Sequence, residues 1–157
     1  MAYLNQSQRD VAGLLTLGIK VSKASATLPQ TTTQDLFVIT GGRVLVMLLV
    51  GEVTVILGAT ANNLSVESNP TVGTTYVIAS TVEGNAQEAG SLLIVEGDGT
   101  ALIDAGLAGA GPIISGTGRW VCPVGTIQFR TAASTTGETK WDLWYVPLDD
   151  GAAVVSA

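Results

Sequence analysis

The chain has 157 residues, of which 13% are charged and 46% hydrophobic, and it contains one cysteine and no histidine. Ordinary domains carry about 25% charged residues, so threonine, serine, glycine and apolar side chains must form much of the surface. Without histidine, serine and cysteine nucleophiles lack their usual base, and zinc, iron and copper sites lack a common ligand. The composition therefore indicates an assembly subunit with no catalytic residue, no cofactor, no metal and no small-molecule substrate.

The net charge of −6 results from 13 acidic and 7 basic residues, and the basic residues are scattered along the chain. Phosphate binding needs clustered lysine and arginine, so we expect no nucleic-acid partner. The apolar run 44–57 is interrupted by Gly51 and is shorter than the ~20 residues of a membrane helix, so we expect no membrane partner. Lys20 and Lys23 follow the apolar run 11–19 instead of preceding it, which is the wrong order for a secretion signal.

The first 34 residues differ in character from the rest of the chain. Ser7–Asp10 has the spacing of a helix N-cap, which predicts a short helix over 8–15. The segment 22–34 is polar and rich in threonine, favours an extended backbone and could add a strand to the sheet edge of a partner. We therefore expect residues 1–34 to form an N-terminal arm, ordered only against another surface, and residues 35–157 to form the body.

In the body, short runs of β-branched and aromatic residues alternate with turn signals such as Gly41-Gly42. The stretch 43–57 predicts one long strand, or two pieces hinged at Gly51. It alternates so little that both of its faces should be covered, one by a second sheet and the other by a neighbouring subunit. Residues 100–118 fit no element, and 148–157 read as a tail. The other expected strands are 36–40, 64–67, 74–82, 91–96, 119–122, 126–130 and 140–146.

This pattern predicts a mainly β fold, a β-sandwich or barrel of about seven to nine short strands with an N-terminal arm that carries a short helix. In the last expected strand, Trp141, Leu143 and Tyr145 lie on one face, and Trp144 lies on the other. The first face should fill the core, and Trp144 is a candidate subunit contact because aromatic anchors dominate interface energetics. The candidate protein-interface residues are Tyr3, Leu4, Val21, Leu28, Trp120 and Trp144.

Three segments carry a resemblance to a known family: the opening Met1–Asp10, the Gly-Gly-Arg-Val-Leu-Val of 41–46, and the closing Lys140–Ala152. In these, the chain resembles small structural proteins of tailed bacteriophages, the capsid decoration or cement proteins. The likeness spans the chain, is one of pattern and transfers no functional residue. It implies a homo-oligomer, with a trimer favoured, whose arm lies across the major capsid protein on the virion surface after synthesis in the host cytoplasm.

Two alternatives remain open beside a decoration protein. The first is another virion component, such as a tail-tube, neck or fibre-associated subunit. The second is a carbohydrate-binding module or a carboxylate glycosidase, in which Trp120, Trp141 or Trp144 would stack on the sugar. The acid pair would then be Glu96 and Asp98, although the glycines around Asp98 favour a turn. Cys122, in apolar surroundings, is expected to be buried and unreactive.

Overall fold

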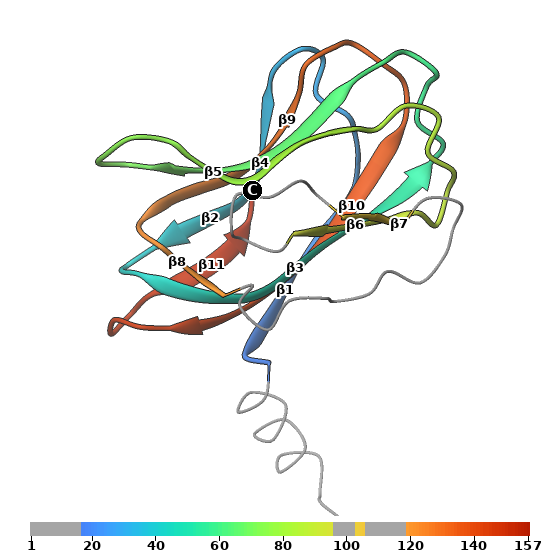
Figure 1. Ribbon diagram of the computed structural model, residues 1–157. Helices are drawn as coiled ribbons and strands as arrows, with labels where there is room; N and C mark the ends of the chain where they lie inside the picture. Colours follow the sequence, from blue (N-terminus) through green and yellow to red (C-terminus); the bar gives the residue numbers. More distant parts are fainter. Residues whose placement is uncertain (1–16, 96–102, 106–118) are drawn as a thin grey trace, which may run out of the picture.

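The computed structural model describes residues 17–95, 103–105 and 119–157, which form two antiparallel sheets (Figure 1). This confirms the mainly β prediction, but with more strands than the expected seven to nine; the predicted helix 8–15 lies outside the described residues. Sheet A has the order β1 (Ile19–Thr27), β10 (Glu138–Pro147), β3 (Val44–Val55), β6 (Leu92–Val95) and β7 (Ile103–Ala105), and β8 (Trp120–Cys122) also pairs with β3. Sheet B has the order β11 (Ala153–Ser156), β2 (Thr33–Thr40), β9 (Gly125–Thr131), β4 (Asn63–Pro70) and β5 (Tyr76–Glu83).

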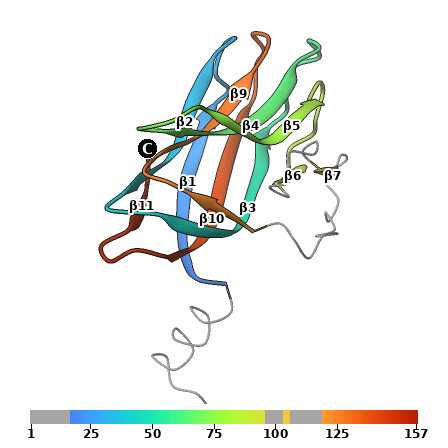
Figure 2. The same ribbon diagram turned by 60° about the vertical axis from the view of Figure 1, so that its left-hand side comes forward.

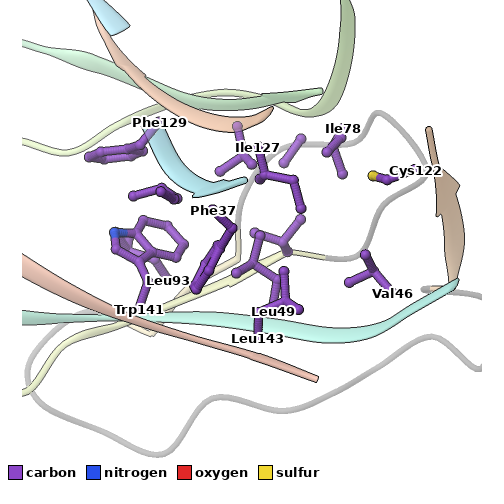
Figure 3. Packing of buried hydrophobic residues seen from close by; sticks show 14 of the residues in the cluster. Phe37, Val46, Leu49, Ile78, Leu93, Cys122, Ile127, Phe129, Trp141 and Leu143 are labelled. Atoms are coloured by element: carbon purple, nitrogen blue, oxygen red, sulfur yellow. The ribbon is translucent and has the colours of Figure 1, made fainter. Parts of the chain in front are cut away.

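The inner faces of the two sheets share one hydrophobic core (Figure 3). Trp141 of β10 and Phe129 of β9 meet across it, with ring centroids 5.1 Å apart and a tilt of 55°, a geometry that aromatic pairs favour. The indole Nε1 of Trp141 donates to Thr139 Oγ1 at 3.1 Å, so this buried polar atom has a partner. The predicted inward and outward faces of β10 are confirmed, because Trp141 is 1% exposed and Trp144 is half-buried.

Gly51 lies opposite Trp141 in the pairing of β3 with β10. A Cβ at Gly51 would lie 2.8 Å from two atoms of the indole ring, too close for any side chain. β3 runs through this position as a single strand (Figure 2). The glycine is therefore required by the tryptophan packed on it and does not act as a hinge, which resolves the two interpretations of 43–57 in favour of one long strand.

The boundary expected at residue 34 does not separate an arm from the body. Residues 19–27 form β1, which pairs with β10 in the same chain (Figure 2). Thr27 and Leu28 continue into the body, where Leu28 N–H donates to the carbonyl of Gly137 at 3.1 Å. The polar segment predicted to augment a partner's sheet thus augments its own, since β1 supplies the backbone partners that β10 needs along its free edge.

The expected tail also contains a strand. Residues 153–156 form β11, which pairs with β2 at the edge of sheet B. Lys23 Nζ donates to the carbonyl oxygen of Ala157 at 2.7 Å, and Ala157 N–H donates to the carbonyl of Leu36 at 3.2 Å. The last residues of the chain are thereby held between β1 and β2, where the edges of the two sheets approach each other.

β6 and β8 are two pieces of one interrupted strand. Both run antiparallel to β3 on the side away from β10, β6 opposite residues 49–52 and β8 opposite residues 44–46. Only Met47 and Leu48 of β3 lie between the two paired stretches. The chain between the pieces is therefore an insertion into a strand position, and β7 within it extends sheet A beyond β6.

We expect that replacing residues 96–119 by two residues, the number that faces Met47 and Leu48, leaves a cooperatively folding protein. The register of β3 already places the two pieces in line, and a shorter connection costs less closure entropy. Thermal unfolding followed by circular dichroism should show one transition, within about 5 °C of the full-length midpoint. A second variant joins β6 and β8 by a flexible Gly-Ser linker of about ten residues, as a control for a two-residue connection that is too short. Loss of cooperative unfolding in both variants would show that the insertion is needed for the fold.

The turn between β2 and β3 is held against the turn that follows β10. Asp149 Oδ2 accepts the backbone N–H of Arg43 at 2.7 Å and its Nε at 2.9 Å, and Oδ1 accepts Nη2 at 2.8 Å. Gly41 has a φ of +74°, and a Cβ there would collide with the carbonyl oxygen of Gly151. The hydrogen bonds from the side chain and backbone of Arg43 hold the pKa of Asp149 well below its ordinary value of 3.8.

We expect Asp149→Asn to lower the unfolding midpoint at neutral pH and to lose this effect in acid. A carboxylate whose pKa is lowered by folding stabilises the protein at pH values above the pKa of that carboxylate in the unfolded state. The stabilisation disappears as the pH falls through the pKa of the carboxylate in the folded state. The difference between native protein and variant, measured by thermal unfolding from about pH 7 to about pH 2, should therefore narrow below about pH 4. Asp150→Asn removes the same charge from the adjacent exposed residue and should show no such pattern. A difference that stays constant into acid would contradict the role of the Arg43 contact.

Candidate protein interface

The face of sheet A that points away from the core carries a strip of apolar side chains. On β10 and β3, most outward residues alternate with core residues and are half-buried; the alternation is interrupted at Met47 and Leu48 of β3, where the pairing with β10 shifts register. Trp144 pairs with Leu48, Val146 with Leu45, and Asp142 with Val50, so the apolar side chains are neighbours across the two strands. We call this set the outer strip; it consists of Leu45, Leu48, Val50, Trp144 and Val146.

Charged pairs of both signs border the outer strip. Lys20 Nζ lies 3.1 Å from Asp142 Oδ1 and 5.0 Å from the centroid of the Trp144 ring, so the ammonium contacts both a carboxylate and an aromatic face. Lys140 Nζ lies 2.8 Å from Glu52 Oε2 on the neighbouring strand. These exposed pairs contribute little to stability. Because each cation is matched by a carboxylate, the border adds no net charge beside the apolar strip.

The outer face of sheet B is different, because hydrogen-bonded polar groups cover its central strands. Gln128 Nε2 donates to Asp35 Oδ1 at 2.6 Å, and Arg130 Nη1 lies 3.4 Å from Glu67 Oε1. An antiparallel sheet with one solvated face shows this arrangement of polar residues outside and apolar residues inside. Of the two outer faces, the face of sheet A is therefore the candidate for protein contact.

The structure describes four of the six predicted interface residues. Tyr3 and Leu4 lie outside the described residues. Leu28 is 2% exposed and belongs to the core, so it is not a surface contact, and Val21 packs partly buried against the same core. Trp144 lies on the outer strip. Trp120 is half-buried and lines a cavity between β8 and the β4–β5 hairpin.

Sequence reasoning did not identify the four aliphatic members of the outer strip individually, Leu45, Leu48, Val50 and Val146. The signal was nevertheless present, since the lack of alternation in 43–57 had predicted that both faces of this strand are covered. What the sequence did not contain was the register that places Trp144 beside Leu48. Only this pairing joins the outward residues of two distant segments into one surface.

Of the residues considered for sugar chemistry, the structure describes the three tryptophans, and it places Trp141 in the core, Trp144 on the outer strip and Trp120 beside the cavity. Trp141 is 1% exposed and offers no ring face to a ligand. Glu96 and Asp98 lie outside the described residues. Within the described ranges, no three Cys, Asp or Glu side chains are close enough to hold a metal ion, and no helix has the length and apolarity to cross a membrane.

The prediction for Cys122 is confirmed as far as burial is concerned. Its side chain is 0% exposed and lies in the core at the β8 end of sheet A (Figure 3). Burial raises the pKa of the Cys122 thiol above its ordinary value, which leaves little thiolate at neutral pH.

Comparison of the chain with protein-family models, with curated proteins and with solved structures gave no match.

Proposed function

We propose that this protein is a structural component of a tailed-phage virion that binds the outside of the capsid lattice and stabilises the shell. In this proposal the body is a β-sandwich with a short N-terminal arm, the protein is a homo-oligomer, a trimer by the family resemblance, and the partner is the major capsid protein. It is made in the host cytoplasm, resides on the capsid surface and performs no bond-making chemistry. The observation that carries the proposal is the outer strip of sheet A.

The outer strip suits a permanent contact for two physical reasons. Burial of apolar side chains is favourable, and the low charge of the chain limits the polar groups that would have to be desolvated on binding. The bordering pairs Lys20–Asp142 and Lys140–Glu52 resemble the polar rim of an interface, which adds orientation rather than energy. An oligomer that repeats this contact on a lattice would gain avidity without a strong single contact.

The test is add-back of the purified full-length protein to shells of the encoding phage that lack it. We expect native protein to co-sediment with the shells and to raise the temperature at which they disrupt. Leu48→Asp, which places a carboxylate in the centre of the outer strip, should abolish co-sedimentation while its circular dichroism remains that of the native protein.

Val38→Asp is the matched control. Val38 is also a half-buried aliphatic residue on an outward strand position, but it lies on sheet B. This variant should bind shells as the native protein does. If native protein does not bind, the proposed function is wrong; if Leu48→Asp binds equally well, the outer strip is not the contact.

A further inference from the structure

The β4–β5 hairpin ends in an exposed apolar side chain. The hairpin projects from the body in two views (Figures 1 and 2). Val72, in the loop between the two strands, is 89% exposed, more than any other large hydrophobic residue in the described ranges. The loop is held in place, since Thr71 N–H donates to the carbonyl of Val124 at 2.9 Å and Thr75 Oγ1 donates to Asn69 Oδ1 at 3.1 Å. Val72 is therefore presented on a preorganised loop, which lowers the entropic cost of binding through it.

A small cavity opens at the base of the same hairpin. Its volume is about 160 Å³, and an apolar cavity of about 150 Å³ accommodates a benzene molecule, so one valine side chain fits. Tyr76 and Val121 at its mouth are 60% and 52% exposed. Apart from the weakly accepting thiol of Cys122, Trp120 Nε1 has no acceptor within the described chain. The cavity is lined by Ser68, Pro70, Thr74, Tyr76, Ile78, Trp120, Val121 and Pro123.

No residue of the hairpin loop 71–75 is charged, and none of the described residues that line the cavity is charged. The chain as a whole carries a net charge of −6, so copies of it repel one another except where their contact surfaces are neutral. The surface is self-complementary, because each copy carries both an apolar knob, Val72, and an uncharged cavity that can accept the Val72 of another copy. A second copy of this chain therefore fits this surface in both shape and charge.

We propose that copies of this protein associate through the β4–β5 hairpin, with Val72 of one copy seated in the cavity beside Trp120 of another. The knob lies at the tip of the β4–β5 hairpin and the cavity lies between the base of this hairpin and β8, so the contact forms a closed oligomer when the copies are arranged around a symmetry axis at which the hairpins converge. The inference deepens the oligomeric part of the proposed function and rests on it, but it is independent of whether the oligomer binds a capsid.

Sedimentation velocity of the full-length protein tests the proposal. We expect the native protein to be an oligomer, and Val72→Asp to weaken self-association by more than roughly tenfold, because a carboxylate in an apolar cavity loses its hydration. Val121→Trp fills the mouth of the cavity and should have the same effect from the other side of the contact. Val155→Asp, at a residue that is 51% exposed on the opposite edge of sheet B, is the control and should keep the native mass.

A native protein that sediments as a monomer overturns the inference, and so does a Val72→Asp variant that keeps the native mass. Circular dichroism of each variant separates loss of association from loss of fold. Addition of the same samples to shells separates the two proposals. If the native protein is an oligomer but does not bind shells, only the proposed function is contradicted. If the Val72→Asp variant binds shells and keeps the native mass, only the hairpin contact is contradicted.

Discussion

Replacing Trp141 by alanine should destabilise the protein by about 3–5 kcal/mol, the range for removal of a fully buried large aromatic side chain. Trp141 is 1% exposed, contacts Phe129 of the opposite sheet and covers Gly51 on the adjacent strand. Removal of the indole therefore opens a cavity that both sheets line. Chemical denaturation followed by far-ultraviolet circular dichroism measures the free energy of unfolding without relying on tryptophan fluorescence.

Trp144→Ala is the matched control on the same strand. Trp144 is half-buried on the outer strip, where it contacts Lys20 and pairs with Leu48. Surface cation–π and cross-strand pairs contribute about 1 kcal/mol or less, so this variant should lose far less stability than Trp141→Ala. Equal losses at the two positions would contradict the assignment of Trp141 to the core and Trp144 to the outer surface.

The contact between Trp141 and Gly51 allows a sharper check. Gly51→Ala alone should cost about 1–3 kcal/mol, because its Cβ forces the indole ring to move. In the Trp141→Ala background the ring is absent, and the same substitution should be neutral or stabilising, since alanine loses less backbone entropy than glycine. Additive effects in this double-mutant cycle would show that the two residues do not interact.

The faces of the central strands could be predicted from sequence, because alternation is a local property. In the expected strand 126–130, a period of two puts Ile127 and Phe129 on one face and Gln128 and Arg130 on the other, and both apolar residues are 0% exposed. It likewise separated Trp141 from Trp144. In these strands every second side chain points toward the other sheet, so the alternation of apolar and polar residues indicates which face is inward.

Two of the edge strands, β1 and β11, could not be predicted in the same way. β1 is stabilised chiefly by its backbone pairing with β10, as in Ile19 opposite Tyr145, and most of its side chains are exposed. β11 has only four residues, of which one, Val154, is buried in the core. Backbone hydrogen bonds do not depend on side-chain type, so a polar edge strand and a polar arm look alike in a sequence. The sequence also did not show that β6 and β8 pair with neighbouring stretches of β3 on the same side, because this depends on the register of backbone pairing.

Removing residues 1–27 should abolish cooperative folding, whereas removing residues 1–17 should not. The longer truncation deletes β1 and leaves β10 without a partner along one edge, in a strand that contains Trp141, Leu143 and Tyr145. An unpaired edge of this length and apolarity is a site of aggregation. Thermal unfolding and sedimentation of both truncations measure the effect; the shorter one keeps all of β1 and serves as the control.

A peptide of residues 18–27 should restore folding to the 1–27 truncation when added in trans, because strand addition reproduces the backbone ladder with β10. Proline has no N–H, so Ser22→Pro in that peptide should prevent rescue if the ladder with β10 uses the N–H of residue 22. Ala24→Gly keeps every N–H of the peptide and serves as the control. If the 1–27 truncation unfolds cooperatively near the full-length midpoint, β1 is a detachable arm after all. If it does not, β1 belongs to the body; in the proposed function, an arm that reaches a capsid subunit is then confined to the residues before β1, and the outer strip is the described surface that remains for this contact.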